Sequence, residues 1–326
     1  MKIQLKRIAV SLLITGACLY VACNKDNTTP SNTQSTFSTY SSIQDFYAQN
    51  GVPMQSYSVN GSAGGHFTTP QGTIVTIPAN SFIDKGGNPI TGTVTIEFKD
   101  IYTKSDMLLS NMPPQYYGTP LKSGGEFFIR AKSAGNAVNV ATGKSITIKQ
   151  PLNSWAADNN MIPFVGMPDT IGNKNWVPKA LDSIGGPGEA LADSATGYVW
   201  SLYSFGTPVD SGTWCNSDNS SYFSAYPQTT LTIQTTDSIN SGTSVFLLFN
   251  NLSSMVHVYQ GTGKTFPYNY APQGLQCTIV AVEVMFYGQF RCCFTPITIT
   301  ANSTVNFSCS PSTISAFKAQ LSTYNH

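Results

Sequence analysis

The sequence predicts an all-β protein in which two β-sandwich domains in tandem follow a signal peptide and a flexible tether and end in a short helix. Only 10% of the residues are charged, whereas 41% are hydrophobic. Short runs of Val, Ile, Thr and Phe recur, and 27 Gly and 19 Pro interrupt them. Branched and aromatic residues favour strands, while Gly and Pro mark turns. At 326 residues the chain is long enough for two such cores.

Residues 1–22 have the organisation of a signal peptide. Lys2, Lys6 and Arg7 form a positive start, and the apolar run 8–22 is short for a membrane span. An uncleaved apolar anchor is the alternative. Cleavage would leave 14 of the 17 basic residues against 16 acidic ones, with no basic stripe. We therefore expect no nucleic-acid partner, because phosphate binding needs clustered Lys and Arg.

The signal peptide ends in LYVAC, which places Cys23 after two small residues. This motif resembles the lipobox of bacterial lipoproteins, whose cysteine is lipidated and becomes the mature N-terminus. Tyr20 departs from the usual aliphatic residue, and Cys18 is a competing acceptor. Lys25 and Asp26 are similar to the export signal of surface-exposed Bacteroidota lipoproteins. The resemblance implies an outer-membrane lipoprotein facing outward, with a periplasmic orientation as the alternative.

We expect residues 23–40 to form the tether, because they are mostly Asn, Thr, Ser, Pro and Gln. Residues 41–152 should hold a short helix at 41–51, with a Ser cap and Asn-Gly at its end, and the first sandwich. Alternating or branched segments predict four of its strands, at 73–77, 91–98, 126–131 and 145–148.

Five spaced elements of this domain carry a family resemblance. They are the sequences GT at 72–73, IPANSF at 77–82, GTV at 92–94, DML at 106–108 and LKSGGEF at 121–127. Together they resemble the ZU5-type β-sandwich repeated in many Bacteroidota surface lipoproteins. The resemblance implies a fold and brings no catalytic signature.

Between the two sandwiches, residues 153–228 predict an extended connection with one strand at 198–205. Its segment GTWCNSD resembles the Gly-Trp-x-Asn-x-Asp element that follows the sandwich in the same lipoproteins, although Thr213 separates the Gly from the Trp. Asn216 and Asp218 could contribute to a Ca²⁺ site or act as turn-forming residues.

Residues 229–326 predict the second sandwich and the closing helix, at 312–321. This part resembles a small Ig-like or carboxypeptidase-regulatory-like domain, with a tight hairpin at Tyr287-Gly288-Gln289. The expected strands are 229–235, 244–250, 255–259, 277–287, 289–295 and 297–301.

The sequence singles out no catalytic residue, no metal ligand and no cofactor. His66-Phe67-Thr68 is similar to the self-cleavage element of certain ZU5 domains, but its placement near the start of the domain favours a surface strand. The chain has three His and neither an HExxH nor a Cys-x-x-Cys spacing, so a zinc site has little support.

Five cysteines remain after Cys23, and an odd number in an oxidising compartment leaves at least one unpaired. We expect one disulfide in the second sandwich that involves Cys277 or Cys309, with buried apolar thiols as the alternative. Neighbouring Cys292 and Cys293 should point to opposite faces of a strand.

Four triplets, each an Asp followed by a Ser or Thr and then by an apolar residue, resemble the O-glycosylation acceptor of exported Bacteroidota proteins. Chance occurrence is the alternative. Their hydroxyl residues are Thr170, Ser183, Ser194 and Ser238.

The expected function is a non-catalytic binding or structural accessory role at the cell surface, with a protein or glycan ligand. The four Trp and 16 Tyr favour carbohydrate binding only if some are exposed together, for example Trp155 with Trp176; otherwise they are core residues. One alternative is a hydrolase of polysaccharide or peptide, which would need a cleft with paired carboxylates. The other is an accessory subunit of an outer-membrane import complex, for which a flat apolar patch would be the sign.

Overall fold

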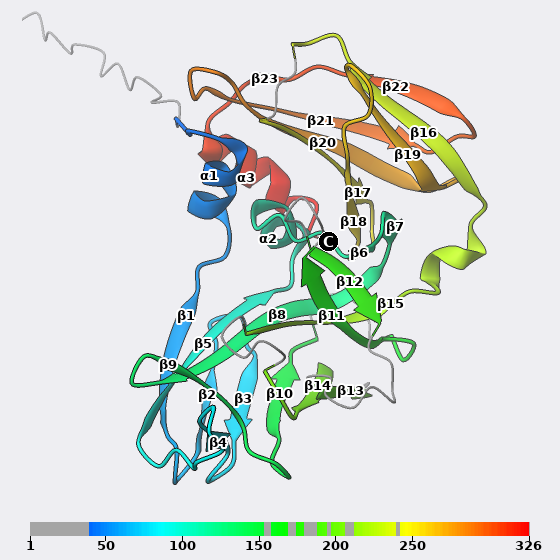
Figure 1. Ribbon diagram of the computed structural model, residues 1–326. Helices are drawn as coiled ribbons and strands as arrows, with labels where there is room; N and C mark the ends of the chain where they lie inside the picture. The colour runs from blue at the N-terminus through cyan, green and yellow to red at the C-terminus, as the bar shows by residue number, and fades with distance from the viewer. Residues whose placement is uncertain are drawn as a thin grey trace, which may run out of the picture. The chain divides into compact units, whose positions relative to one another are not determined.

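The computed structural model describes residues 39–152, 158–168, 174–178, 188–193, 197–205, 212–238 and 242–325. Strands dominate these residues and three α-helices accompany them, so the predicted all-β class with a short C-terminal helix is confirmed (Figure 1). Within the described ranges, no helix combines the length and the apolar character needed to cross a bilayer.

The first sandwich consists of an eight-stranded sheet facing a five-stranded sheet. The larger sheet contains β1 (Gln55–Asn60), β5 (Thr93–Ile101), β8 (Lys122–Ser133), β15 (Thr213–Asn219), β11 (Ile162–Pro168) and β12 (Lys174–Pro178) in that order. β9 (Asn136–Val140) also pairs with β8, and β4 (Phe82–Ile83) pairs with β9. The smaller sheet contains β13 (Gly188–Asp193), β14 (Gly197–Leu202), β10 (Ile146–Gln150), β3 (Ile74–Ile77) and β2 (Gly65–Thr68).

Alternation along the strands builds the core between these two sheets. Val94, Ile96 and Phe98 of β5 are fully buried, and they belong to one cluster with Ile148 and Trp200 from the opposite sheet. Inward residues at every second position are what a strand buried on one face requires.

The prediction of an extended connection over 153–228 is wrong for its described parts. Five strands form there, and β15 is a central strand that pairs with β8 on one side and β11 on the other. Its buried side chains include Asn216, Ser217 and Asp218. A strand whose buried residues are polar lacks the alternation of apolar residues by which strands are recognised.

The second sandwich consists of a three-stranded and a five-stranded sheet. The first contains β19 (Thr265–Pro272), β16 (Gln228–Thr235) and β22 (Ser303–Phe307). The second contains β18 (Met255–Val258), β17 (Thr243–Phe249), β20 (Gln276–Val284), β21 (Phe290–Thr298) and β23 (Ser310–Pro311). A separate apolar cluster fills the space between them.

One strand prediction in this domain is wrong, and three strands were not expected. Residues 297–301 are not a separate strand, because β21 continues past Pro296 to Thr298. The strands that were not expected are β19, β22 and β23. A proline lacks the N–H that a ladder needs. Pro296 is tolerated because the outer edge of β21 pairs with β23 only at Arg291 and Cys292.

A third apolar cluster joins the two sandwiches through the helices α1 (Ile43–Asn50), α2 (Lys104–Leu109) and α3 (Ile314–Ser322). The predicted helices at both ends are confirmed, and Ser42 caps α1 by accepting a 3.0 Å hydrogen bond from the Asp45 N–H. Phe46 of α1 stacks on Phe290 at 5.1 Å, and Phe317 of α3 lies edge-on to the same ring at 5.3 Å. Both helices therefore pack on β21.

Candidate functional site

A cavity lined by aromatic residues lies where the second sandwich meets a short hairpin that precedes β8 in the chain. The hairpin consists of β6 (Gln115–Tyr116) and β7 (Thr119–Pro120). The cavity has a volume of about 550 Å³, within the range of small-molecule sites. Its lining comes from the β6–β7 turn, β12, β18 and β19, namely Tyr117, Gly118, Asn175, His257, Val258, Tyr259, Pro267, Tyr268, Asn269 and Tyr270.

The β6–β7 turn is held in a defined position against this cavity. Tyr117 and Gly118 both have positive φ, 46° and 87°, which allows the two-residue connection. The Tyr117 N–H donates a 3.1 Å hydrogen bond to Asn175 Oδ1. A Cβ built on Gly118 would lie 3.4 Å from Tyr270 Cδ2, so the turn backbone rests on that ring.

Gln115 fastens β6 to β18 beneath the cavity. Its side chain is fully buried, its Nε2 donates to Tyr259 Oη at 3.1 Å, and its Oε1 accepts from the His257 N–H at 2.8 Å. Both ends of the amide are thus satisfied by β18 and its following residue. Because the wall is fixed before any ligand arrives, little ordering cost remains for binding.

The cavity presents aromatic surface without Asp, Glu, Lys or Arg among its described lining residues. Tyr117 is 64% exposed and Tyr270 is 42% exposed, whereas Tyr268 is buried. The Tyr268 Oη has no hydrogen-bond partner among the described residues, and burial raises its pKa well above the usual value, so the phenol stays protonated. A neutral polar ligand matches this combination of rings and uncharged hydrogen-bonding groups.

The aromatic pair suggested by the sequence does not form this surface. Trp176 is fully buried in the cluster that joins the sandwiches, and Trp155 lies outside the described residues. Tyr117 and Tyr270 were not singled out. A register shift between Thr229 and Leu231 of β16, opposite the β19 residues 268–271, accompanies the exposure of both Asn269 and Tyr270, and such a shift leaves no sequence signature.

A second polar cluster lies inside the first sandwich, where Glu126 of β8 and Asp218 of β15 are both fully buried. Burial raises the pKa of each carboxyl group well above its usual value, and the charge of Asp218 adds to the effect at Glu126. Converging acids with raised pKa values are what a hydrolase would use. However, neither carboxyl is exposed to a substrate, and the cavities described at the surface are lined by other residues.

Asn216 and Asp218 do not occupy a turn, because both belong to the central strand β15. The Asn216 Nδ2 donates to Asp218 Oδ2 at 2.7 Å, and its Oδ1 accepts from Ser123 Oγ at 2.9 Å. The turn-forming interpretation is therefore wrong, and the oxygen that a Ca²⁺ ion would need from Asn216 is already engaged. In the described ranges no group of three or more His, Cys, Asp or Glu is placed to hold a metal ion.

Glu126→Gln is expected to change how stability depends on pH. An acid whose pKa is higher in the folded state contributes stability that is complete below its unfolded pKa, 4.5 here, and is lost as the pH rises toward the folded value. The unfolding free energy of the wild type should therefore fall relative to that of the variant between about pH 4 and pH 8, by about 1–3 kcal/mol. Urea unfolding of both proteins across this range measures the difference, and a difference that does not vary with pH would contradict the prediction.

The structure places the remaining sequence candidates as follows. His66 and Thr68 are exposed in β2, so the surface-strand prediction is confirmed. Of the four acceptor candidates only Ser238 is described, and it is exposed. Thr170, Ser183, Ser194 and Cys23 lie outside the described residues.

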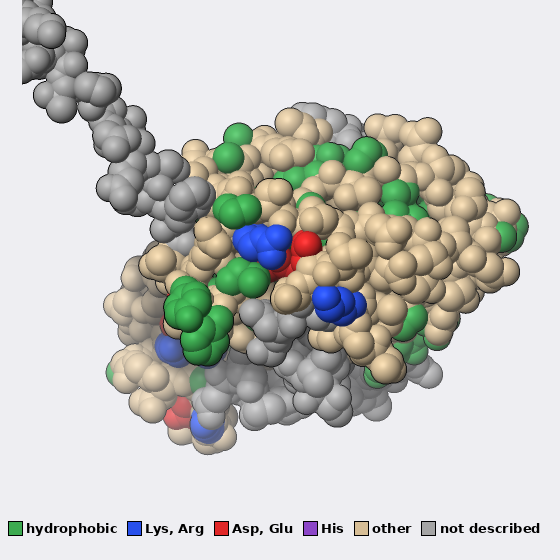
Figure 2. Space-filling model, turned by 90° about the horizontal axis from the view of Figure 1, so that it is seen from above, with side chains coloured by type: hydrophobic (Ala, Val, Ile, Leu, Met, Phe, Trp, Pro, Cys, Tyr) green, Lys and Arg blue, Asp and Glu red, His purple; other side chains and the backbone are tan. Residues whose placement is uncertain are grey.

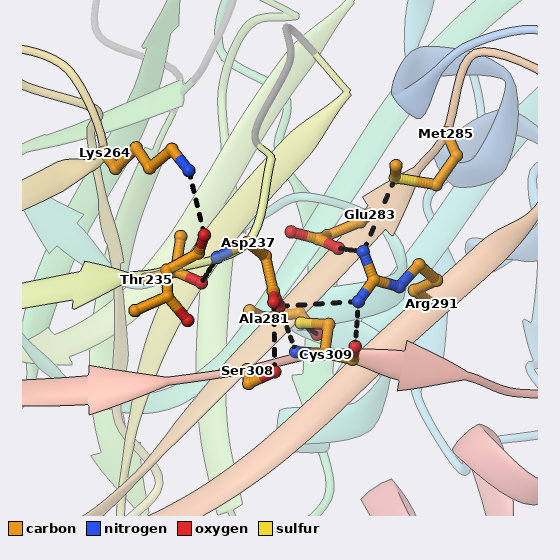
Figure 3. Close-up of polar contacts among 10 residues, drawn as sticks. Thr235, Asp237, Lys264, Ala281, Glu283, Met285, Arg291, Ser308 and Cys309 are labelled. Atoms are coloured by element: carbon orange, nitrogen blue, oxygen red, sulfur yellow. Dashed lines mark hydrogen bonds and ion pairs between the residues drawn. The ribbon is translucent and has the colours of Figure 1, made fainter.

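Asp237, which precedes Ser238, has a structural role. Figure 3 shows its carboxylate accepting hydrogen bonds from Ser308 Oγ at 3.1 Å and from the Cys309 N–H at 2.7 Å, and facing Arg291 Nη2 at 3.4 Å. This aspartate therefore tethers the segment after β22 to the end of β16.

The structure shows all five described cysteines as free thiols. A disulfide that involves Cys309 stays a prediction, because the thiols of Cys293 and Cys309 are hydrogen-bonded to each other. Cys309 Sγ lies 4.0 Å from the Ala281 oxygen of β20. Cys277 is in the same strand as Ala281 but four residues earlier, which is about 13 Å along β20, so it is too far from Cys309. Disulfides need Cα atoms within about 7 Å. Cys293 is the residue paired with Ala281. The prediction that Cys292 and Cys293 face opposite sides is confirmed, because they pack against different apolar clusters.

No protein-family model matches the sequence, and a search of curated proteins finds no significant match. Conclusions about function therefore depend on the residues of the chain itself.

Proposed function

We propose that this chain is a lipid-anchored cell-surface protein that binds a neutral carbohydrate, without catalysis, in the cavity between β18, β19 and the β6–β7 turn. The observation that carries the proposal is the pair of exposed rings, Tyr117 and Tyr270, on a wall already fixed by Gln115. Sugar rings present C–H faces that pack on aromatic rings, and their hydroxyl groups pair with amides and phenols.

The uncharged surroundings support a neutral ligand over an ionic one. Asn269 is exposed beside Tyr270, so its side-chain amide is accessible to the hydroxyl groups of a ligand. The signal-peptide and lipobox patterns that end at Cys23 support the location, and the ZU5-like and Ig-like assignments of the two sandwiches are part of the same proposal.

Tyr270→Ala and Tyr117→Ala are each expected to weaken glycan binding about tenfold, because a lost aromatic contact is worth about 1.4 kcal/mol. The full chain is first screened on a glycan array, and the best neutral oligosaccharide is then titrated by calorimetry. Tyr203→Ala is the matched control, since Tyr203 is a 47% exposed tyrosine at the end of β14 in the other sandwich, and it should bind as the wild type does.

Three results would overturn parts of this proposal. Equal affinities for all three variants would remove the cavity as the site. Cleavage of the bound oligosaccharide would replace binding by hydrolysis. Crosslinking on intact native cells that repeatedly recovers one transporter, without glycan binding in the titration, would assign the chain to an import complex instead.

The surface face in Figure 2 has few charged side chains. Its hydrophobic side chains form separate groups between backbone and uncharged side chains.

A further inference from the structure

The turn between β20 and β21 carries the two most exposed large hydrophobic side chains among the described residues. Phe286 and Tyr287 are each 88% exposed, and their rings lie edge to face at 5.1 Å. The cavity described above uses neither residue. A pair of aromatic side chains held almost wholly in water is a sign of a surface that meets something else.

Backbone hydrogen bonds close this turn, which we call the aromatic turn. Its backbone closes through the Gly288 N–H, which donates to Met285 O at 2.7 Å, and the Met285 N–H, which donates to Gln289 O at 2.9 Å. Gly288 has a φ of 76°, and a Cβ at this position would lie 2.9 Å from Tyr40 O. The backbone that carries the two rings is therefore held in a defined turn against Tyr40.

The first described residues of the chain lie against this turn. Thr39 forms a β-bridge with Gln289, and the Tyr40 N–H donates to Gly288 O at 3.1 Å. Cys23 precedes Thr39 by 16 residues, which can span at most about 55 Å. A lipid on Cys23 would thus keep the aromatic turn within that distance of the membrane that holds it.

We infer that Phe286 and Tyr287 enter the interfacial layer of the lipid bilayer to which Cys23 is anchored, and so orient the protein on the membrane. This inference rests on the lipid anchor of the proposed function. Aromatic rings, and tyrosine in particular, favour the boundary between head groups and acyl chains, where one edge is apolar and the other is hydrated. A lipid anchor gains a second contact in this way.

The contact is apolar in character. Arg291 lies beside the turn, with its Nη1 at 3.9 Å from Met285 Sδ, but its guanidinium group faces the carboxylates of Glu283 and Asp237. Because this cation is compensated within the protein, the inference requires no anionic lipid. Insertion should be similar in neutral and in anionic vesicles, and insensitive to salt.

The test is depth-dependent fluorescence quenching with the full lipidated chain. Phe286→Trp is reconstituted in phosphatidylcholine vesicles whose acyl chains carry bromine near the head group, and its emission is compared with that of the wild type, which has four Trp. We expect the added emission to be quenched at least twofold. Ile74→Trp, at a 40% exposed position of β3, is the matched control and should not be quenched.

Intact-mass spectrometry of the same sample shows whether a negative result contradicts the membrane contact of the aromatic turn or the lipid anchor itself. A lipid on Cys23 together with unquenched Phe286→Trp emission overturns the inference and leaves the anchor in place. Absence of lipid on Cys23 overturns both the anchor and this inference, while the glycan titration stands independently. A photocrosslinker at position 286 that repeatedly captures one protein on native cells, with no quenching in vesicles, would assign the turn to a protein partner.

Discussion

Arg291→Met is expected to lower the free energy of unfolding by about 3–5 kcal/mol, because it leaves a buried carboxylate without its cation. Glu283 is fully buried in β20, and its Oε2 lies 3.3 Å from Arg291 Nη1. Burial raises the pKa of Glu283, and the charge of Arg291 opposes that rise. The same guanidinium group also binds Asp237, the backbone oxygen of Cys309 and Met285 Sδ, so one substitution removes four contacts (Figure 3).

A double variant shows whether the unpaired charge is the cause. Glu283→Gln in the Arg291→Met background removes the buried charge and should restore at least half of the lost stability, as buried pairs replaced together cost much less than one partner removed alone. Lys264→Met is the control for loss of a cation, since Lys264 is exposed and its Nζ donates a 2.9 Å hydrogen bond to Thr236 O. Urea unfolding of the wild type and the three variants gives the free energies of unfolding. If Arg291→Met lowers this free energy by less than about 1 kcal/mol, the unpaired buried charge is not the cause.

Gly197→Ala should destabilise the first sandwich by about 4 kcal/mol or more, since it combines overpacking with backbone strain. Gly197 opens β14 with a φ of 128°, and a Cβ there would lie 1.8 Å from Gln150 O. Gln150 cannot move away freely. Its side chain accepts a 3.0 Å hydrogen bond from Trp200 Nε1 and donates a 2.9 Å bond to Gly125 O.

The matched control is Gly92→Ala, because a Cβ at Gly92 meets nothing within 4 Å and its φ is not in the left-handed region. Gly92→Ala should unfold at the same urea concentration as the wild type or slightly above it, since alanine restricts the unfolded chain. Soluble Gly197→Ala protein with an unchanged midpoint would show that β14 can be displaced without cost.

Local signals in the sequence account for the elements that could be predicted. The Ser42 cap marks α1, the alternation of Val94, Ile96 and Phe98 marks β5, and the periodic residues Phe317 and Leu321 mark α3. These elements bury apolar side chains at regular spacing, so their own sequence is sufficient evidence.

Elements stabilised by distant polar partners could not be predicted in this way. β15 buries Asn216 against Ser123, and α2 has only six residues, so neither shows an apolar period. The cavity depends on Tyr117 and Tyr270, which come from different parts of the chain and are exposed only because of the β6–β7 turn and the shift in β16. Exposure of a ring is a property of the fold, and the sequence alone does not contain it.

The shared packing of α1 and α3 on Phe290 has a consequence for biogenesis. During synthesis the chain emerges from its N-terminus, so Phe46 is available long before Phe317. Until the final helix arrives, the apolar surface of α1 and β21 has no cover on that side. The newly made protein would therefore remain a substrate for holding chaperones until its last helix has been synthesised, and the joint between its sandwiches would be the last part to become resistant to proteases.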